Sequence, residues 1–324
     1  MQADRRRINA PPGGTAPPVF ASPKNTTLKR PTRTRKPDEH RKLFLRTGVV
    51  PSASGSAYYE IPPQTPQQQG LLVPASSSLK ITCSVHGPRP LPRNAAFSPN
   101  LLLTTHVKFA PFATRSRRGY VRDAGERDLG MHLDTALRGV IIGERWPKSG
   151  CEVVITVLEG EEDGWWGDAG GKDGGGGWGM MSVLAGCITV ASAALVDAGI
   201  DCVDMVSGGV AALVCDGQDD GKTDRGARMV LDPSPAEHRE IRAACVVGYL
   251  QSRDEVTEMW MKGDVGTQVE ALLDEAVRAA SLTRSVLAEA LREAVELKMG
   301  AGLDDANGGL KEDKGKKKDV VMSG

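Results

Sequence analysis

Several features that would assign a function at once are missing from this chain of 324 residues. No stretch approaches about 18 to 20 consecutive apolar residues, so a membrane span is not expected. The basic N-terminus is not followed by an apolar segment, which argues against a secretory signal. There is no Cys-x-x-Cys pair, and we expect reduced, mostly buried thiols and a reducing compartment for the six cysteines Cys83, Cys151, Cys187, Cys202, Cys215 and Cys245.

The sequence also lacks clear motifs for a metal site, a nucleotide site or a catalytic nucleophile. The five histidines (His40, His86, His106, His132 and His238) share no ligand spacing, and there is no His-Glu-x-x-His or Gly-x-Ser-x-Gly motif. Gly167–Asp173 places three residues, where a Walker motif has four, before its Gly-Lys pair. An Asp also stands where that motif needs a hydroxyl for magnesium. We therefore predict no metal and no cofactor.

The net charge is zero, but the charges are segregated. Between Met1 and Lys36 there are nine Lys or Arg residues and a single acid, Asp4. Such a segment has little to bury, so residues 1–37 are predicted to form a disordered basic arm. It fits a nuclear-import signal, a nucleic-acid contact or a solvated tail without a specific role.

The ordered region alternates between strand and helix signals. Period-two alternation and β-branched runs predict strands over 43–45, 56–61, 79–85, 101–109, 151–158, 203–214 and 227–231, and a hairpin over 241–250 and 256–261. Helical spacing of apolar residues predicts helices over 125–144, 182–198 and 269–294, the last either continuous or broken near Ser281. This order indicates a mixed α+β domain with helices packed on sheets.

Composition sets the predicted boundaries. One domain is expected over 38–299, followed by a disordered Lys-rich tail over 300–324. Two low-complexity insertions interrupt it, about 62–77 with a Gln-rich centre and 160–181 with ten glycines. Both fall in predicted loops, where long insertions cost little stability.

Four motifs occur in a recognisable order: Ser54–Glu60, Ser84–Pro90, Pro111–Thr114 and Asp197–Ile200. On these residues the chain resembles the RNase PH family, and most closely the RNase PH-like ring subunits of the eukaryotic exosome. The resemblance covers about 38–297 and implies the RNase PH fold, a duplicated strand-helix unit of the ribosomal S5 domain 2 type. The two insertions favour a fungal member.

The resemblance implies that active members hold phosphate with a Gly-Ser/Thr-Arg triplet in the loop that enters the helix before Asp197. A hydroxyl, an Arg fork and backbone amides at a helix N-terminus suit a phosphate dianion. Counting back from Ser192, the triplet falls on Ser182, Val183 and Leu184. Since Val183 and Leu184 offer neither hydroxyl nor cation, the phosphate site is predicted to be degenerate.

A second element of active members is a set of acids that bind metal or act as general acid. Asp232 matches the first of them and Glu237 matches a neighbouring acid. The next acid falls near Arg239, and the following one near Ala243 or Ala244. The segment 238–242 is thus basic where the enzymes are acidic, which predicts a degenerate acid site.

The densest basic cluster of the predicted domain comprises Arg115, Arg117, Arg118, Arg122 and Arg127, and Tyr120 lies between them. Related ring subunits contact the RNA backbone with this segment near the pore. Arg forks suit phosphates and an aromatic ring suits a base. A solvated loop or an interface with an acidic neighbour remains open.

These features together imply a structural ring subunit without catalytic activity. Its partners would be other RNase PH-like ring subunits, S1/KH-type cap subunits and RNA, without a membrane. We expect it in the nucleus and nucleolus and also in the cytoplasm. Two alternatives remain open: an active phosphorolytic 3′-5′ exoribonuclease whose site a partner completes, and a free-standing RNA-binding protein.

Overall fold

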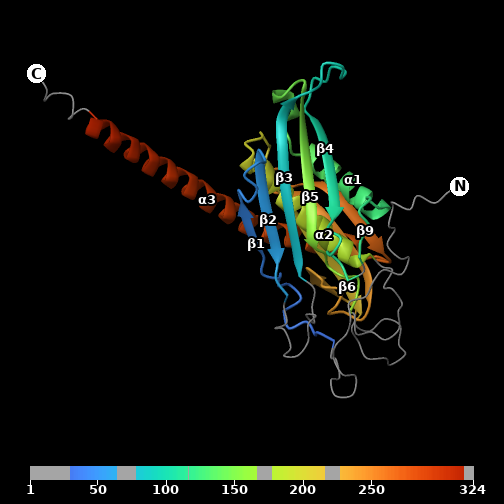
Figure 1. Cartoon of the computed structure of the whole chain (residues 1–324). Coiled ribbons are helices and arrows are strands. Elements are labelled where there is room, and N and C mark those ends of the chain that lie inside the picture. The colour runs from blue at the N-terminus through green and yellow to red at the C-terminus, as the bar shows by residue number, and fades with distance from the viewer. Residues whose placement is uncertain (1–29, 64–77, 116, 166–176, 216–226, 317–324) are drawn as a thin grey trace, which may run out of the picture.

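The computed structural model describes residues 30–63, 78–115, 117–165, 177–215 and 227–316. Most of the first insertion and the centre of the second lie outside these residues, as does most of the N-terminal arm. The described part contains two β-sheets, two helices between them and a long C-terminal helix that leaves the body (Figure 1).

The larger sheet has five strands in the order β1-β2-β3-β5-β4. Their bounds are β1 Phe44–Thr47, β2 Gly55–Ile61, β3 Leu79–Pro90, β4 Leu102–Phe109 and β5 Ser149–Glu159. All neighbours are antiparallel except β4 and β5, which are parallel. Side chains of β3 and β5 alternate between buried and half-buried, so one face of the sheet covers the core.

The smaller sheet has four antiparallel strands in the order β7-β6-β8-β9. Their bounds are β6 Val206–Cys215, β7 Ala227–Leu231, β8 Ile241–Leu250 and β9 Glu255–Gly263. Nearly every side chain of β6 and β8 is buried, because this sheet is covered on both faces. The mixed α+β class and the 241–250/256–261 hairpin predicted from the sequence are confirmed.

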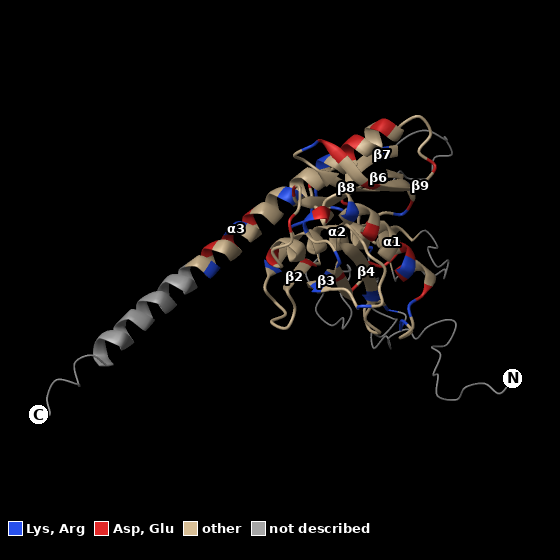
Figure 2. Ribbon diagram, turned by 90° about the horizontal axis from the view of Figure 1, so that it is seen from above, with Lys and Arg blue, Asp and Glu red and all other residues tan. Residues whose placement is uncertain are grey.

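Helices α1 (Ala124–Arg138) and α2 (Trp178–Asp197) lie between the two sheets, and α3 (Val269–Lys316) covers the outer face of the smaller one (Figure 2). A short 3-10 helix, η1 (Gly143–Arg145), precedes β5. Helix α1 begins at a capping box formed by Asp123 and Glu126. It ends at Arg138 before Gly139, earlier than the predicted residue 144.

Helix α2 is the core of the molecule. It begins at Trp178, so the last residues of the predicted 160–181 insertion are helical and not part of a loop. By length and composition α2 is apolar enough to cross a membrane, contrary to the expectation that no such stretch exists. Because 89% of its apolar window is buried inside the protein, we interpret it as a core helix of the fold.

Helix α3 is one unbroken helix and continues to Lys316. The sequence predicts a disordered tail from residue 300, whereas in the structure helix α3 continues through residues 300–316. The helix packs on the sheet as far as Leu291, while Val295, Leu297 and Met299 are exposed.

Two adjacent glycines let helices approach both faces of β6. A Cβ on Gly208 would collide with the backbone of Ala185 in α2, and one on Gly209 would collide with the backbone of Ala276 and Ala280 in α3. The hydroxyl of Ser207 also donates to the Ala280 carbonyl at 2.9 Å. Strand β6 thus fixes the spacing of the whole helix-sheet-helix stack.

The substitution Gly208→Ala should lower the free energy of unfolding by about 1–3 kcal/mol, because a methyl group would force β6 and α2 apart. Gly119→Ala is the matched control: nothing lies within 4 Å of its added Cβ, so we expect a change within about 0.5 kcal/mol. Urea unfolding of both variants measures the difference. Equal stability of the two variants would contradict the close packing.

Candidate functional site

The predicted phosphate triplet lies inside α2 and not in the loop before it. Because α2 begins at Trp178, the N–H groups of Ser182, Val183 and Leu184 follow the unpaired first turn and bond within the helix. The Val183 and Leu184 side chains are fully buried among core residues. No backbone donor and no cation at these three positions is available to an anion.

The N-terminus of α2 is occupied by the chain itself. An Asp163 carboxylate oxygen accepts a hydrogen bond from the Gly179 N–H at 2.9 Å. Burial raises the pKa of Asp163, although N–H groups of Gly179 and Gly177 oppose the shift. The backbone at Glu161 packs so closely on this turn that Gly179 has no room for a Cβ. A phosphate ion could reach the N-terminus of α2 only by displacing the segment that contains Glu161 and Asp163.

The acid site is built around Asp232, which follows β7 with a left-handed backbone (φ 47°) and is buried. Arg41 binds its carboxylate with two guanidinium nitrogens at 2.7 and 2.8 Å and with its backbone N–H at 2.9 Å. The same guanidinium contacts both carboxylate oxygens of Glu161, at 2.7 and 3.0 Å. Arg41 therefore joins two buried acids from distant parts of the chain.

Burial alone would raise the pKa of Asp232, but the charge of Arg41 overcomes it and holds that pKa well below its usual range. For Arg41, burial is likewise opposed by Asp232 and Glu161, which raise its pKa well above the usual value. Both groups therefore stay charged at neutral pH, and the lone pairs of Asp232 are already committed to protein donors.

Two residues of the predicted disordered arm extend this cluster. Arg35 binds Glu237 at 2.7 Å and Asp232 at 3.4 Å. Arg33 donates to the carbonyl oxygens of Leu231 and Lys36 at 3.0 and 2.9 Å, and burial lowers its pKa to about 10. We call Arg33, Arg35, Arg41, Glu161, Asp232 and Glu237 the arginine network.

The sequence predicts a disordered arm over residues 1–37, whereas in the structure Arg33 and Arg35 contact the domain. The sequence held a signal for this: Arg33 and Arg35 alternate with the exposed Thr32, Thr34 and Lys36, the period of an extended chain with one buried side.

Of the other positions of the predicted acid site, Glu237 joins the network, Arg239 is exposed, and Ala243 and Ala244 are buried in β8. Within the described residues, no group of three or more His, Cys, Asp or Glu side chains is arranged to hold a metal ion. The residues around Asp232 are arginines, which are cations. An acid that binds a metal ion would instead need free lone pairs.

The five predicted RNA-binding arginines fall into two groups. Arg118 is engaged by the protein, with Asp123 at 3.1 Å and the Phe109 ring at 4.9 Å, and the backbone N–H of Arg115 donates to Glu162 at 2.7 Å. Arg117, Arg122 and Arg127 are exposed. Arg127 donates to the Arg122 carbonyl at 3.3 Å, so these two lie together.

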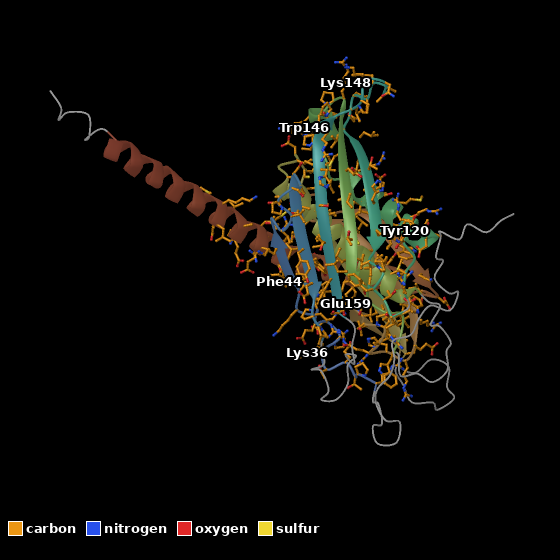
Figure 3. All side chains as sticks on the ribbon, viewed as in Figure 1. Lys36, Phe44, Tyr120, Trp146, Lys148 and Glu159 are labelled. Atoms are coloured by element: carbon orange, nitrogen blue, oxygen red, sulfur yellow. The ribbon has the colours of Figure 1, made fainter. Side chains whose placement is uncertain are left out.

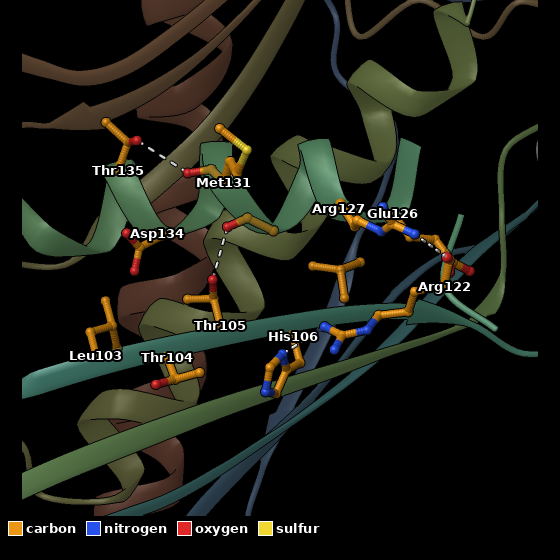
Figure 4. A pocket seen from close by; sticks show the side chains of 12 residues that line it. Leu103, Thr104, Thr105, His106, Arg122, Glu126, Arg127, Met131, Asp134 and Thr135 are labelled. Carbon is orange, nitrogen blue, oxygen red and sulfur yellow. Dashed lines mark hydrogen bonds between the residues drawn. The ribbon is translucent and has the colours of Figure 1, made fainter. Parts of the chain in front are cut away.

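Arg122 and Arg127 form one end of a groove of about 550 Å³ between β4 and α1 (Figure 4). Arg122 donates to Nδ1 of His106 at 2.7 Å, which places the imidazole proton on Nε2, 3.6 Å from Glu152. Met131 and Asp134 line the groove along α1. The basic end of this groove suits a phosphate, and sequence reasoning missed the contribution of His106.

Comparisons with known proteins agree with this architecture. The family described as "3′ exoribonuclease family, domain 1", RNase PH, matches residues 39–201. The chain is 50% identical over 297 residues to exosome complex component MTR3 of Chaetomium thermophilum, covering 90% of this chain and 99% of that one. The Schizosaccharomyces pombe component mtr3 is 29% identical over 292 residues, with 89% and 96% covered.

A solved structure of rice (Oryza sativa) Rrp46 superposes with a TM-score of 0.56 at 16% identity, covering 80% of this chain and 98% of that chain. The chain therefore belongs to the RNase PH family, and the predicted RNase PH fold is confirmed. Within that family it is similar to the exosome components called MTR3, and human MTR3 is 27% identical over 278 residues.

The substitution Arg41→Met should reduce the free energy of unfolding at pH 7 by about 3–5 kcal/mol, because it leaves Glu161 and Asp232 buried with fewer cations. In the parent, the depressed pKa of Asp232 stabilises the fold above about pH 4, and this stability is lost as pH falls through the folded-state pKa. In the variant, the unpaired acids should prefer to be protonated, so its stability should rise between pH 7 and pH 5.

Urea unfolding at several pH values measures this difference. Arg138→Met is the control, because Arg138 is exposed and pairs with Asp134 on the same helix, a contact that contributes about 0.3–0.5 kcal/mol. If Arg41→Met matched the parent at pH 7 and at pH 5, the network would not hold the fold together.

Proposed function

We propose that this chain is a catalytically inactive RNase PH-like subunit of the hexameric ring of the RNA exosome. It supports 3′-5′ RNA processing and degradation by scaffolding its neighbours and lining the RNA channel. The similarity to MTR3 proteins over almost their whole length supports the ring assignment, since their names describe them as exosome components. Phosphorolysis by this chain is not part of the proposal.

The arginine network carries the proposal of inactivity. An acid that binds metal or donates a proton during phosphoryl transfer needs an open side toward the substrate. Asp232 is 4% exposed and is held by Arg41 and Arg35. Val183 and Leu184 are buried in α2, and Asp163 takes the helix N-terminus. Three separate parts of a phosphorolytic site are therefore unsuited to phosphate and metal.

The sheet edges support a role in assembly. Strand β4 ends the larger sheet, and β7 and β9 end the smaller one. Such edges expose unpaired backbone groups that a neighbouring chain can cover. We propose other RNase PH-like ring subunits and S1/KH-type cap subunits as neighbours and RNA as the ligand. The nucleus and nucleolus, with the cytoplasm, are the proposed locations, supported by the basic sequence before residue 37.

The full chain, purified alone and as a pair with an RNase PH-like partner of the opposite type, should show no phosphate-dependent RNA degradation attributable to its own Asp232. The reason is that Arg35 and Arg41 already bind the Asp232 carboxylate. Turnover of labelled RNA with inorganic phosphate measures it. If the parent pair degrades RNA and Asp232→Asn in this chain abolishes that activity while the pair remains assembled, the chain is an enzyme.

The same preparation tests the ring role. A tagged full chain should co-purify with RNase PH-like chains in equal amounts, and expression without a partner should give self-associated material. Restoring the triplet through Val183→Ser and Leu184→Arg is not a usable rescue, because both positions lie in the core. A stable monomer without stoichiometric partners would overturn the ring proposal and leave an RNA-binding protein as the better account.

The triple change Arg117→Glu, Arg122→Glu and Arg127→Glu should weaken RNA binding by the assembled complex and make it less dependent on salt, because fewer counterions are released. These three side chains are exposed, so assembly should be unaffected. RNA affinity is measured at several salt concentrations. The control is Arg138→Glu, an exposed cation at the far end of α1. If the RNA affinity and its dependence on salt were unchanged, the cluster would be surface charge without a role in RNA binding.

A further inference from the structure

The basic end of the β4–α1 groove holds a histidine between an arginine and a carboxylate. Figure 4 shows the His106 ring and the Arg122 guanidinium turned toward each other, and Nη1 of Arg122 donates to Nδ1 of His106 at 2.7 Å. On the other side of the ring, Nε2 of His106 lies 3.6 Å from a carboxylate oxygen of Glu152 on β5. The His106 side chain is 34% exposed, so an ion in solution can reach it. The two ring nitrogens therefore face charged neighbours of opposite sign.

The loop that carries Arg122 is held in place from β4. The Lys108 ammonium donates to two carbonyl oxygens of this loop, at 2.9 and 3.4 Å, and binds both carboxylate oxygens of the buried Glu126 at 2.8 Å. Figure 3 shows the exposed Tyr120 of the same loop on the β4 side of the larger sheet, with Phe44 of β1 on the other side. The guanidinium therefore meets the histidine from an anchored loop at the open edge of the sheet.

The acidic side chains that line the groove are already paired within the chain. Glu126 is bound by the ammonium on β4, and a carboxylate oxygen of Asp134 lies 2.6 Å from Nε of Arg138. Arg122 and Arg127 differ from these acids. Within the described part of the chain, the two arginines donate to a histidine nitrogen and to a backbone carbonyl and make no ion pair. Their positive charges are therefore available to an anion.

Protonation of His106 changes what this end of the groove can bind. In the neutral ring Nδ1 accepts the proton of Arg122, whereas in the charged ring both nitrogens are donors. Two cationic donors at this separation repel each other, and an anion that accepts from both removes the repulsion. Glu152 can accept from Nε2 in either state. The other charged or titratable groups around the groove are Lys108 on β4, His86 opposite Glu152 on β3, the Arg118–Asp123 pair in the loop, and Glu126, Arg127 and Asp134 on α1.

We infer that the basic end of this groove is a proton-linked phosphate site, in which Arg122, Arg127 and the protonated His106 hold one backbone phosphate of bound RNA. The inference rests on the proposed RNA contact of the arginine cluster and adds its regulation. At higher pH the neutral imidazole occupies Arg122 through their hydrogen bond. At lower pH the imidazole becomes a third cation, so RNA binding takes up a proton and tightens as the pH falls.

The test measures the affinity of the full chain for fluorescein-labelled oligouridine by anisotropy at about pH 5.5 and about pH 7.5, where histidine is mostly charged and mostly neutral. The parent should bind about tenfold more tightly at the lower pH, because uptake of one proton contributes at most about tenfold per pH unit. His106→Asn keeps a neutral acceptor for Arg122 but cannot gain the proton. It should match the parent at the higher pH and lose most of the gain at the lower pH.

His106→Lys carries a positive charge at both pH values, so its affinity at the higher pH should equal that of the parent at the lower pH. The matched control is His132→Asn, because His132 is another half-buried histidine but pairs with Glu258 of β9 at 2.8 Å. It should keep the full pH response. Thermal unfolding at both pH values confirms that each variant is folded.

Imidazole signals in NMR spectra, assigned with His106→Asn, provide a second measurement. By reciprocity, bound RNA should keep His106 protonated to a higher pH than in the free chain. Inorganic phosphate is the comparison probe. If phosphate alone has this effect and RNA has none, the site is for a free ion and the inference is overturned.

Equal pH dependence of RNA binding in the parent and in His106→Asn would also overturn the inference, and so would the absence of RNA binding at both pH values. Failure of the proposed ring role would be a different result, because it is judged by co-purification of RNase PH-like chains with the parent. A chain that assembles normally but shows no response of its own His106 would keep the ring role and lose the phosphate site.

Discussion

Arg41 connects three distant parts of the chain through one guanidinium group. It binds Glu161 after β5 and Asp232 after β7, while its own position leads into β1. Both carboxylates are buried, so each would carry a large desolvation cost without this partner. The arm residues Arg33 and Arg35 then close the outer side through Leu231 and Glu237. Ion pairs therefore hold the junction of the two sheets together. Apolar packing alone would not determine which strand ends meet there.

The same interaction governs the surroundings of Asp232. The charge of Arg41 holds the pKa of the Asp232 carboxyl well below its usual range, and protein donors bind both of its oxygens. The α2 N-terminus follows the same logic, since Asp163 from the preceding connection satisfies a backbone donor. Both Asp232 and the N-terminus of α2 are thus engaged in contacts within the chain. The exposed arginines beside the β4–α1 groove are open to a polyanion.

Much of the fold could be predicted because its elements have strong local periodicity. The alternation along 79–85 marks β3, and the spacing of Leu129, Leu133 and Leu137 marks the buried side of α1. The predictions differ from the structure where contacts between residues far apart in the sequence determine the local structure. The order of Arg33 and Arg35 depends on acids about 200 residues away, which a local reading of charge cannot detect. Val140 and Ile141 fit the helical spacing and so predict a later end for α1, whereas Gly139 ends the helix. The three-dimensional grouping of Arg122 with His106 likewise needs the pairing of β4 with α1.

Helix α3 has a consequence for dynamics. Its 48 residues make it about 70 Å long. Among the described side chains, its buried apolar contacts end at Leu291, and Lys298 makes an ion pair with Asp197 of α2 at 2.6 Å. Amides in the docked part can exchange with solvent only when the sheet beneath them opens. From its C-terminal end, such a helix can fray one turn at a time. A single continuous helix should therefore show two hydrogen-exchange regimes, and the boundary between them would reveal how far along α3 any neighbouring molecule reaches.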